Sequence, residues 1–208
     1  MKLTFLQKIP LGLANFLFPF KFYGKENLID GKAVVVSNHF SAIDCVHYLN
    51  LSKDRPYFLA KKELFEKKFL NWLFTKYGGL PIDRENPDLK AMLQAMKVLK
   101  NGEKLVIFPE GTRNKTGTNK LQEIKGGAVI FAVKSKAPII PVMMLNKPRL
   151  FKRTKIMIGK SFDLSEFYDK KLTEEDYVQM ENIVRDKMLE QQICLIEKLK
   201  KKKGNKWL

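Results

Sequence analysis

The 208-residue sequence has very little cysteine and very little histidine, with two residues of each. Cys45 and Cys194 are too few for a disulfide framework, and neither belongs to a Cys-x-x-Cys pair. This composition favours a reducing, cytoplasmic-side location, with a single disulfide between the two cysteines as the alternative. It also offers no plausible set of zinc ligands, so we expect no metal site.

The sequence also lacks a long apolar run. A transmembrane helix needs ~20 mostly apolar residues, and the nearest candidate, residues 3–20, is interrupted by Lys8, Pro10 and Pro19. No small-residue cleavage site follows this stretch, so it does not resemble a signal peptide. Its large apolar side chains are bordered by lysines, which favours an amphipathic helix lying in the membrane interface. Packing of the same residues on the protein's own core is the alternative, and the two roles can coexist.

Acidic residues are scarce relative to basic ones. The chain has 22 Asp and Glu against 39 Lys and Arg, a formal net charge of +17. Such an excess favours a polyanionic partner, which could be a nucleic acid, an anionic membrane, an acidic carrier protein or a phosphate ligand. We expect no nucleic-acid partner, because the basic residues are dispersed and no recognition motif is present. The lysine-rich stretch at 198–206 fits a solvated helix end, an anionic lipid contact or a docking site for an acidic carrier.

The hydrophobic pattern predicts an α/β fold. Short apolar runs that suit buried strands alternate with helical patterns, which is typical of a mixed, mainly parallel sheet flanked by helices. No repeat or Gly/Ser linker divides the chain. We therefore predict an N-terminal amphipathic membrane-association segment at residues 1–24 and a single domain at residues 25–208. The expected strands are 33–37, 57–61, 80–84, 104–108, 138–145 and 155–159, and the expected helices are 42–49, 63–77, 87–102, 126–136 and 173–199.

Two polar residues follow the strand expected at 33–37. His39 is predicted in the turn that leaves this strand, and Asp44 in the first turn of the next helix. The Asp44 carboxylate could hold one imidazole nitrogen, and the other nitrogen could then remove a proton from a substrate hydroxyl. The structural alternative is a capping box, because Ser41-x-x-Asp44 is also a pattern of helix N-termini. The His-x4-Asp spacing alone does not decide between these interpretations.

A second group of polar residues ends the strand expected at 104–108, where residues 108–113 read FPEGTR. Gly111 lets the backbone approach a ligand, Thr112 supplies a hydroxyl, and Arg113 can bind a phosphate through two hydrogen bonds. Arg84 ends another expected strand and is a second candidate phosphate ligand. The alternatives are an ordinary surface turn for the loop, and an ion pair with a neighbouring acid for Arg84.

Together these motifs resemble the phospholipid and glycerol-phosphate acyltransferase family. That family's first block, Asn-His-x-Ser-x-x-Asp, is present at 38–44, and its third, Phe-Pro-Glu-Gly-Thr-Arg, is complete at 108–113. The second block is matched by Ile82 and Arg84, and the fourth, a hydrophobic strand around a proline, by residues 139–142. A Lys-Gly-Gly turn at 125–127 also fits. The blocks occur in family order between residues 33 and 145, and one departure is Asn114, where family members often have serine.

The resemblance implies a reaction. A fatty acyl group would pass from a thioester of acyl carrier protein or coenzyme A to the sn-2 hydroxyl of 1-acyl-sn-glycerol-3-phosphate (lysophosphatidic acid), forming phosphatidic acid in phospholipid synthesis. No cofactor beyond the acyl donor is implied. The chain would work at the cytoplasmic face of the cell membrane, on an anionic surface, as a peripheral or monotopic protein.

The resemblance also implies roles for individual residues. His39 would be the base and Asp44 would hold it. Arg84 and Arg113 would bind the acceptor phosphate, with Lys125 as a further candidate. Glu110 would order its loop or contact the acceptor's glycerol, and amides near Gly111, beside Thr112, could stabilise the oxyanion.

For four other residues we prefer a structural interpretation. Cys45 adjoins Asp44 and could in principle accept an acyl chain, but it is better explained as a small buried helix residue. His47 lies on the same helix and is interpreted as structural. The pair Met143 and Met144 is assigned to the core, with the wall of an acyl groove as the alternative.

Overall fold

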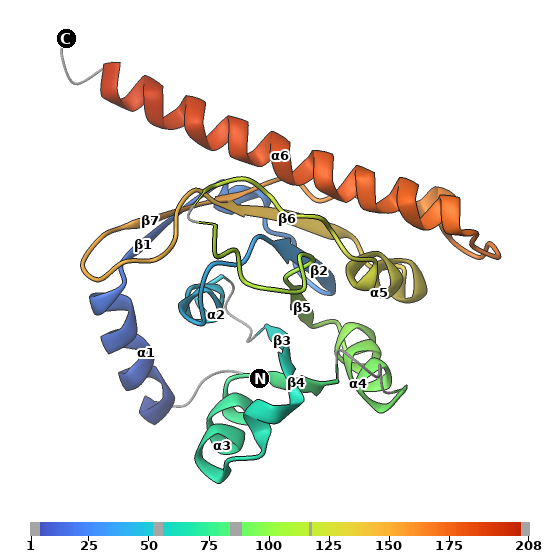
Figure 1. Ribbon diagram of the computed structural model, residues 1–208, viewed down its shortest axis with the longest axis horizontal. Helices are drawn as coiled ribbons and strands as arrows, with labels where there is room; N and C mark the ends of the chain where they lie inside the picture. Colours follow the sequence, from blue (N-terminus) through green and yellow to red (C-terminus); the bar gives the residue numbers. More distant parts are fainter. Residues whose placement is uncertain (1–4, 52–55, 84–88, 117, 205–208) are drawn as a thin grey trace.

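Seven strands form one sheet in the computed structural model, which describes residues 5–51, 56–83, 89–116 and 118–204 (Figure 1). The order across the sheet is β1-β7-β6-β2-β5-β3-β4. Neighbouring strands are parallel except for β6 and β7, which are antiparallel. The prediction of a mixed, mainly parallel sheet is therefore confirmed. The strands are β1 (Phe20–Tyr23), β2 (Ala33–Ser37), β3 (Tyr57–Lys61), β4 (Gly79–Ile82), β5 (Lys104–Ile107), β6 (Ile139–Met144) and β7 (Thr154–Ile158).

The helices cover both faces of the sheet. One core contains side chains from α4, α5 and α6, and a second core, across the sheet, contains side chains from α1 and α2. Figure 1 shows α6 lying along one side of the sheet and α2 on the opposite side. The helices are α1 (Phe5–Leu17), α2 (Ile43–Tyr48), α3 (Lys68–Lys76), α4 (Leu89–Lys100), α5 (Gly127–Ser135) and α6 (Glu174–Gly204).

Strand β2 illustrates why the chain forms this sheet. Its sequence AVVVS is buried at every position. Val34 and Val36 face the core of α4, α5 and α6, whereas Ala33 and Val35 face the core of α1 and α2. A strand covered on both faces needs apolar side chains at every position, so it appears in the sequence as a continuous apolar run.

The register of β2 against β5 positions the polar residues that follow both strands. Ala33 pairs with Lys104, and Val36 pairs with Ile107. Because the strands are parallel, their carboxyl ends lie at the same edge of the sheet, where ligand sites of such folds are found. The turn after β2 and the loop after β5 therefore leave the sheet side by side.

Two elements differ from the sequence prediction. The single helix expected at 63–77 is wrong, because the segment contains a 3₁₀ turn at Lys62–Phe65 and then α3. Lys67 between them is extended, with φ −83° and ψ 121°, which ends one element before the next begins. The strand β1 was not expected, and it lies within the predicted N-terminal segment 1–24, where it pairs with β7. The division at residue 24 and the membrane association of this segment stay predictions.

The helix predicted from residue 173 begins with a capping box. The Thr173 hydroxyl accepts a hydrogen bond from the Asp176 amide (3.2 Å), and the Asp176 carboxylate accepts one from the Thr173 amide (2.8 Å). The helix continues to Gly204, five residues beyond the predicted end. No helix in the described part of the chain combines the length and apolar character needed to cross a membrane.

Candidate active site

The turn between β2 and α2 carries His39 and is held by hydrogen bonds from both sides. The side-chain Nδ2 of Asn38 donates to the Met144 carbonyl (2.9 Å), and its Oδ1 accepts from the backbone amide of Met144 (2.8 Å). These two hydrogen bonds join the turn to the end of β6. The Asn114 amide donates to the His39 carbonyl (2.7 Å) from the loop after β5. The backbone of His39 is thus held in place independently of the contacts that its side chain makes.

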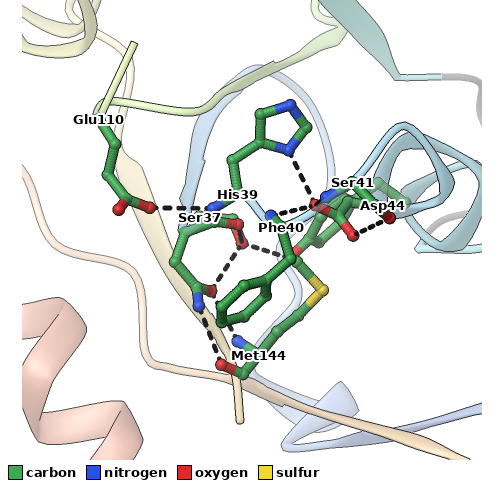
Figure 2. Close-up of polar contacts among 9 residues, drawn as sticks. Ser37, His39, Phe40, Ser41, Asp44, Glu110 and Met144 are labelled. Atoms are coloured by element: carbon green, nitrogen blue, oxygen red, sulfur yellow. Dashed lines mark hydrogen bonds and ion pairs between the residues drawn. The ribbon is translucent and has the colours of Figure 1, made fainter. Parts of the chain in front are cut away.

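The predicted contact between His39 and Asp44 is present. His39 Nδ1 lies 2.8 Å from Asp44 Oδ2, and Asp44 is completely buried. The same carboxylate oxygen accepts hydrogen bonds from the amides of Phe40 (2.6 Å) and Ser41 (2.8 Å). An ionised carboxylate has no proton to donate, so His39 donates from Nδ1 and its neutral ring leaves Nε2 as an acceptor. Figure 2 shows this second ring nitrogen pointing away from Asp44.

Asp44 makes the contacts that both interpretations of its motif require. It accepts two backbone amides ahead of α2, as a capping residue does, and it also orients the imidazole. The Ser41 hydroxyl donates to the other carboxylate oxygen (3.2 Å) instead of accepting from the Asp44 amide, so the capping box is one-sided.

The His39 ring also rests on an aromatic side chain. It stacks on Phe108 with 3.9 Å between ring centroids and 16° between the ring planes. Phe108 is the first residue after β5, so the adjacent strand supports the imidazole that β2 supplies. Stacking on one face and a hydrogen bond at Nδ1 leave the ring little rotational freedom.

Glu110 joins the loop after β5 to the His39 turn. One carboxylate oxygen accepts from the His39 amide (2.9 Å), and the other accepts from the Gln122 amide (3.1 Å). Burial raises the pKa of this carboxyl, and the two backbone hydrogen bonds act in the opposite direction. Both oxygens are occupied by the protein itself, so the geometry fits the predicted loop-ordering role.

The rest of the FPEGTR loop faces outward. Gly111 has a φ of +66°, which glycine adopts without strain, and the Lys125 side chain packs where a β-carbon would project, 3.2 Å from it. Thr112 and Arg113 are exposed. Arg113 lies close enough to α2 for its charge to lower the pKa of Cys45, against the larger effects of burial and Asp44, which raise it to about 12. Arg84 lies outside the described residues.

Sequence reasoning assigned no role to two residues of the site, Asn38 and Phe108. Both were visible in the motifs, but their partners, Met144 and His39, come from other strands, and only the fold shows which strands are neighbours. Asn114, the departure from the family pattern, accepts from the Thr116 amide (3.0 Å) and donates to the Lys120 carbonyl (2.9 Å). An asparagine side chain therefore organises the loop from that position.

An apolar cavity of about 330 Å³ adjoins the turn. It lies between α1, α2, β3, α3 and the start of β4, and Ala42, Ile43 and Cys45 from the first turn of α2 form part of its wall. Asp44 points the other way, toward His39. The cavity therefore begins one residue from the carboxylate that holds the imidazole, and its lining is almost entirely hydrocarbon.

Comparison with known proteins identifies the family. A family model described as Acyltransferase matches residues 19–145. The 1-acyl-sn-glycerol-3-phosphate acyltransferase of Bacillus subtilis (strain 168) is 34% identical over 154 residues, which are 71% of this chain and 75% of that protein. The chain belongs to the acyltransferase family.

Other relatives of this acyltransferase carry the same description. A 1-acyl-sn-glycerol-3-phosphate acyltransferase of Streptococcus pneumoniae (strain ATCC BAA-255 / R6) is 32% identical over 70% of this chain, which spans about half of that relative, 55%. The crystal structure of the 1-acyl-sn-glycerophosphate (LPA) acyltransferase PlsC from Thermotoga maritima superposes with a TM-score of 0.66 at 26% identity. That match covers 93% of this chain and 76% of the other.

Proposed function

We propose that this acyltransferase moves a fatty acyl group from a thioester to the sn-2 hydroxyl of 1-acyl-sn-glycerol-3-phosphate, forming phosphatidic acid. The observation that carries the proposal is the His39–Asp44 pair, which leaves Nε2 of a buried, oriented imidazole as the free proton acceptor. The acceptor itself is proposed from the names of the relatives, because a base of this kind would serve any hydroxyl.

The proton can be followed through the reaction. His39 Nε2 takes the proton of the acceptor hydroxyl as its oxygen bonds to the thioester carbonyl carbon, and Asp44 stabilises the imidazolium that forms. The tetrahedral intermediate then collapses, the carbon–sulfur bond breaks, and the departing sulfur receives the proton from Nε2. The products are an ester and a free thiol, and the histidine is neutral again.

The exposed bases of the loop after β5 are the proposed phosphate ligands. Arg113 and Lys125 both lie beside Gly111 in the part of the loop that faces solvent. A guanidinium can bind two phosphate oxygens together, whereas an ammonium acts as a point charge. Thr112 can add a hydroxyl. Arg84 is proposed as a further ligand on the family motif alone.

The apolar cavity suits a fatty acyl chain. Its walls are hydrocarbon, and each methylene group moved into it from water contributes about 0.8 kcal/mol. A chain bound there would have its carbonyl group at the His39 end of the cavity, since Ala42 and Ile43 follow the catalytic turn directly.

Direct transfer is favoured over an acyl-cysteine intermediate. Cys45 lines the cavity, but burial raises its pKa to about 12. The thiolate is the nucleophilic form, and a raised pKa makes it scarce near neutral pH. The donor is proposed to be a thioester of acyl carrier protein or coenzyme A, and we propose no other cofactor.

The chain is proposed to act at the cytoplasmic face of the cell membrane as a peripheral or monotopic protein. Ile9, Leu13 and Phe16 of α1 are 57–69% exposed and follow a helical spacing, so they form one apolar face. The opposite side of α1 packs on the core through Leu11. An exposed apolar helix face on a protein with a large positive net charge fits an anionic membrane surface.

The test is acyl transfer by purified His39→Ala with lysophosphatidic acid, glycerol 3-phosphate and a lyso-aminolipid as acceptors. A positioned base is worth roughly 10²–10⁴-fold in rate, so a loss of that size is expected with an unchanged unfolding midpoint. In the same assay Arg113→Ala should raise the KM for the acceptor, and Lys115→Ala, an exposed base of the same loop, should not. Full activity of His39→Ala, or preference for an acceptor without phosphate, contradicts the proposal.

A further inference from the structure

The connection between β6 and β7 ends in an exposed apolar tip. Leu150 is 53% exposed and Phe151 62% exposed, although both are large hydrophobic residues. They lie at the centre of a tight turn in which the Lys152 amide donates to the Arg149 carbonyl (3.1 Å). Figure 1 shows this connection extending past the sheet on the side where α1 lies.

The backbone conformation of the turn is unfavourable for a phenylalanine at position 151. Phe151 has a φ of +55°, in the left-handed region that a bulky residue rarely adopts. The third position of such a turn ordinarily holds glycine or asparagine. Neither local backbone preference nor burial in the core therefore explains a phenylalanine here. A large apolar side chain kept exposed at such a position indicates a partner that takes it up.

The tip is surrounded by positive charge. Lys147, Arg149, Lys152 and Arg153 are all exposed, and residues 145–160 contain no acidic residue. Within the described part of the chain, none of these four bases forms an ion pair with a carboxylate. Their charge is therefore available to an anionic partner.

The turn is fixed against the end of α1. The Phe151 amide donates to the Leu17 carbonyl (2.7 Å), and the Phe151 ring meets the Phe16 ring edge to face at 6.0 Å. Phe16 is the last member of the exposed apolar face of α1. The tip and that face therefore form one continuous apolar surface.

We propose that residues 147–153 are a second membrane-binding element, which inserts Leu150 and Phe151 between the headgroups of an anionic bilayer while the four bases bind lipid phosphates. An apolar apex bordered by bases matches the layering of a bilayer surface, with hydrocarbon below and anionic phosphate above. A second copy of this chain would bring like charges together at the same tip. The proposal rests on the proposed membrane attachment of α1 and assigns a separate part of it to this turn.

The test compares vesicle binding of the full chain with that of the double variant Leu150→Ser/Phe151→Gly. Glycine accepts the positive φ of position 151, so the turn can keep its shape. Vesicles of phosphatidylcholine containing phosphatidylglycerol should bind the variant roughly tenfold more weakly, because two large apolar side chains are lost from the interface. The control is Val178→Ser/Ile193→Ser, which removes two exposed apolar residues of α6 and should bind like the parent protein.

A second variant tests the positive charge of the turn separately from its apolar tip. Arg149→Ser/Arg153→Ser leaves the apolar tip intact and should weaken binding to anionic vesicles, with added salt removing the difference. The proposal is overturned if both tip variants bind vesicles as tightly as the parent protein does. It is also overturned if the variants lose binding to single-stranded RNA while their vesicle binding is unchanged. Acyl transfer to lysophosphatidic acid dispersed in detergent should be unchanged in all variants. If the parent protein itself lacks that activity, the proposed function fails while the vesicle result still decides the role of the turn.

Discussion

At the scale of single residues, the site is built from buried groups that each serve more than one neighbour. Asp44 accepts hydrogen bonds from two backbone amides and from His39, and Glu110 accepts from two amides of different segments. Removing such a group leaves buried donors without partners, which costs about 1–3 kcal/mol for each. The geometry of the imidazole and the shape of the turn therefore depend on the same carboxylates.

This sharing gives a prediction for Glu110→Gln. A glutamine has one carbonyl oxygen, so one of the amides of His39 and Gln122 would face the NH₂ group instead of an acceptor. We expect kcat to fall about tenfold as the turn shifts, a smaller loss than the 10²–10⁴-fold expected from removing a base. Steady-state kinetics check this, with exposed Glu123→Gln as the control. A loss as complete as that of His39→Ala would instead make Glu110 a reacting group.

At the scale of elements, α1 has two faces in different surroundings. Leu11 packs on the core. The side-chain amides of Asn15 and Asn50 donate to each other's oxygens, at 3.1 and 3.2 Å, and so join α1 to the end of α2. Ile9, Leu13 and Phe16 face outward. The alternatives of membrane binding and core packing thus concern different residues of one helix.

The outer face of α1 can be tested without disturbing the sheet. Deleting residues 1–22 would remove most of β1, so loss of vesicle binding could reflect unfolding of the sheet edge. Ile9→Gln/Leu13→Gln changes the exposed side chains alone, and binding to anionic vesicles should fall roughly tenfold. Co-sedimentation with vesicles measures this, and the unfolding midpoint should not move. Undiminished binding would assign the attachment to other surfaces.

At the scale of the whole molecule, His47 links stability to pH. It is completely buried on α2, with Nε2 3.1 Å from the Phe18 carbonyl, at the junction of α1 and β1. Burial lowers its pKa from the ordinary value of 6.5. The unfolded chain therefore binds a proton more readily than the folded one. The contribution of His47 to the free energy of unfolding is therefore fully present above pH 6.5 and is lost as the pH falls below that value.

The predicted outcome is a pH-dependent difference between the parent protein and His47→Gln. The parent should lose up to about 1.4 kcal/mol of unfolding free energy per pH unit below 6.5 from this histidine, and the variant should not. Urea unfolding between about pH 7.5 and 5.5 measures the difference. Glu110 titrates in both proteins and cancels in the comparison. Parallel curves of unfolding free energy against pH for the two proteins would show that His47 does not titrate in this pH range.

Much of the fold was predictable because its signals are local. A continuous apolar run such as 33–37 can be satisfied only between two covered faces, and the Thr173 capping box acts within four residues. The break at Lys67 and the strand β1 were missed for the opposite reason. The apolar spacing of residues 63–77 continues across the break, and Phe20–Tyr23 is a strand only because β7 lies beside it.

The sequence by itself predicted the residues of the candidate site that lie in short motifs. His39 and Asp44 are five residues apart, and the FPEGTR loop is contiguous, so their chemistry is recognisable from short stretches of chain. The tertiary structure decided which partners these residues have. Phe108 under the imidazole, Glu110 on the His39 amide and Asn38 on Met144 all join different strands. Strand order and register are set by the burial of whole faces, which is a property of the complete chain and not of any single motif.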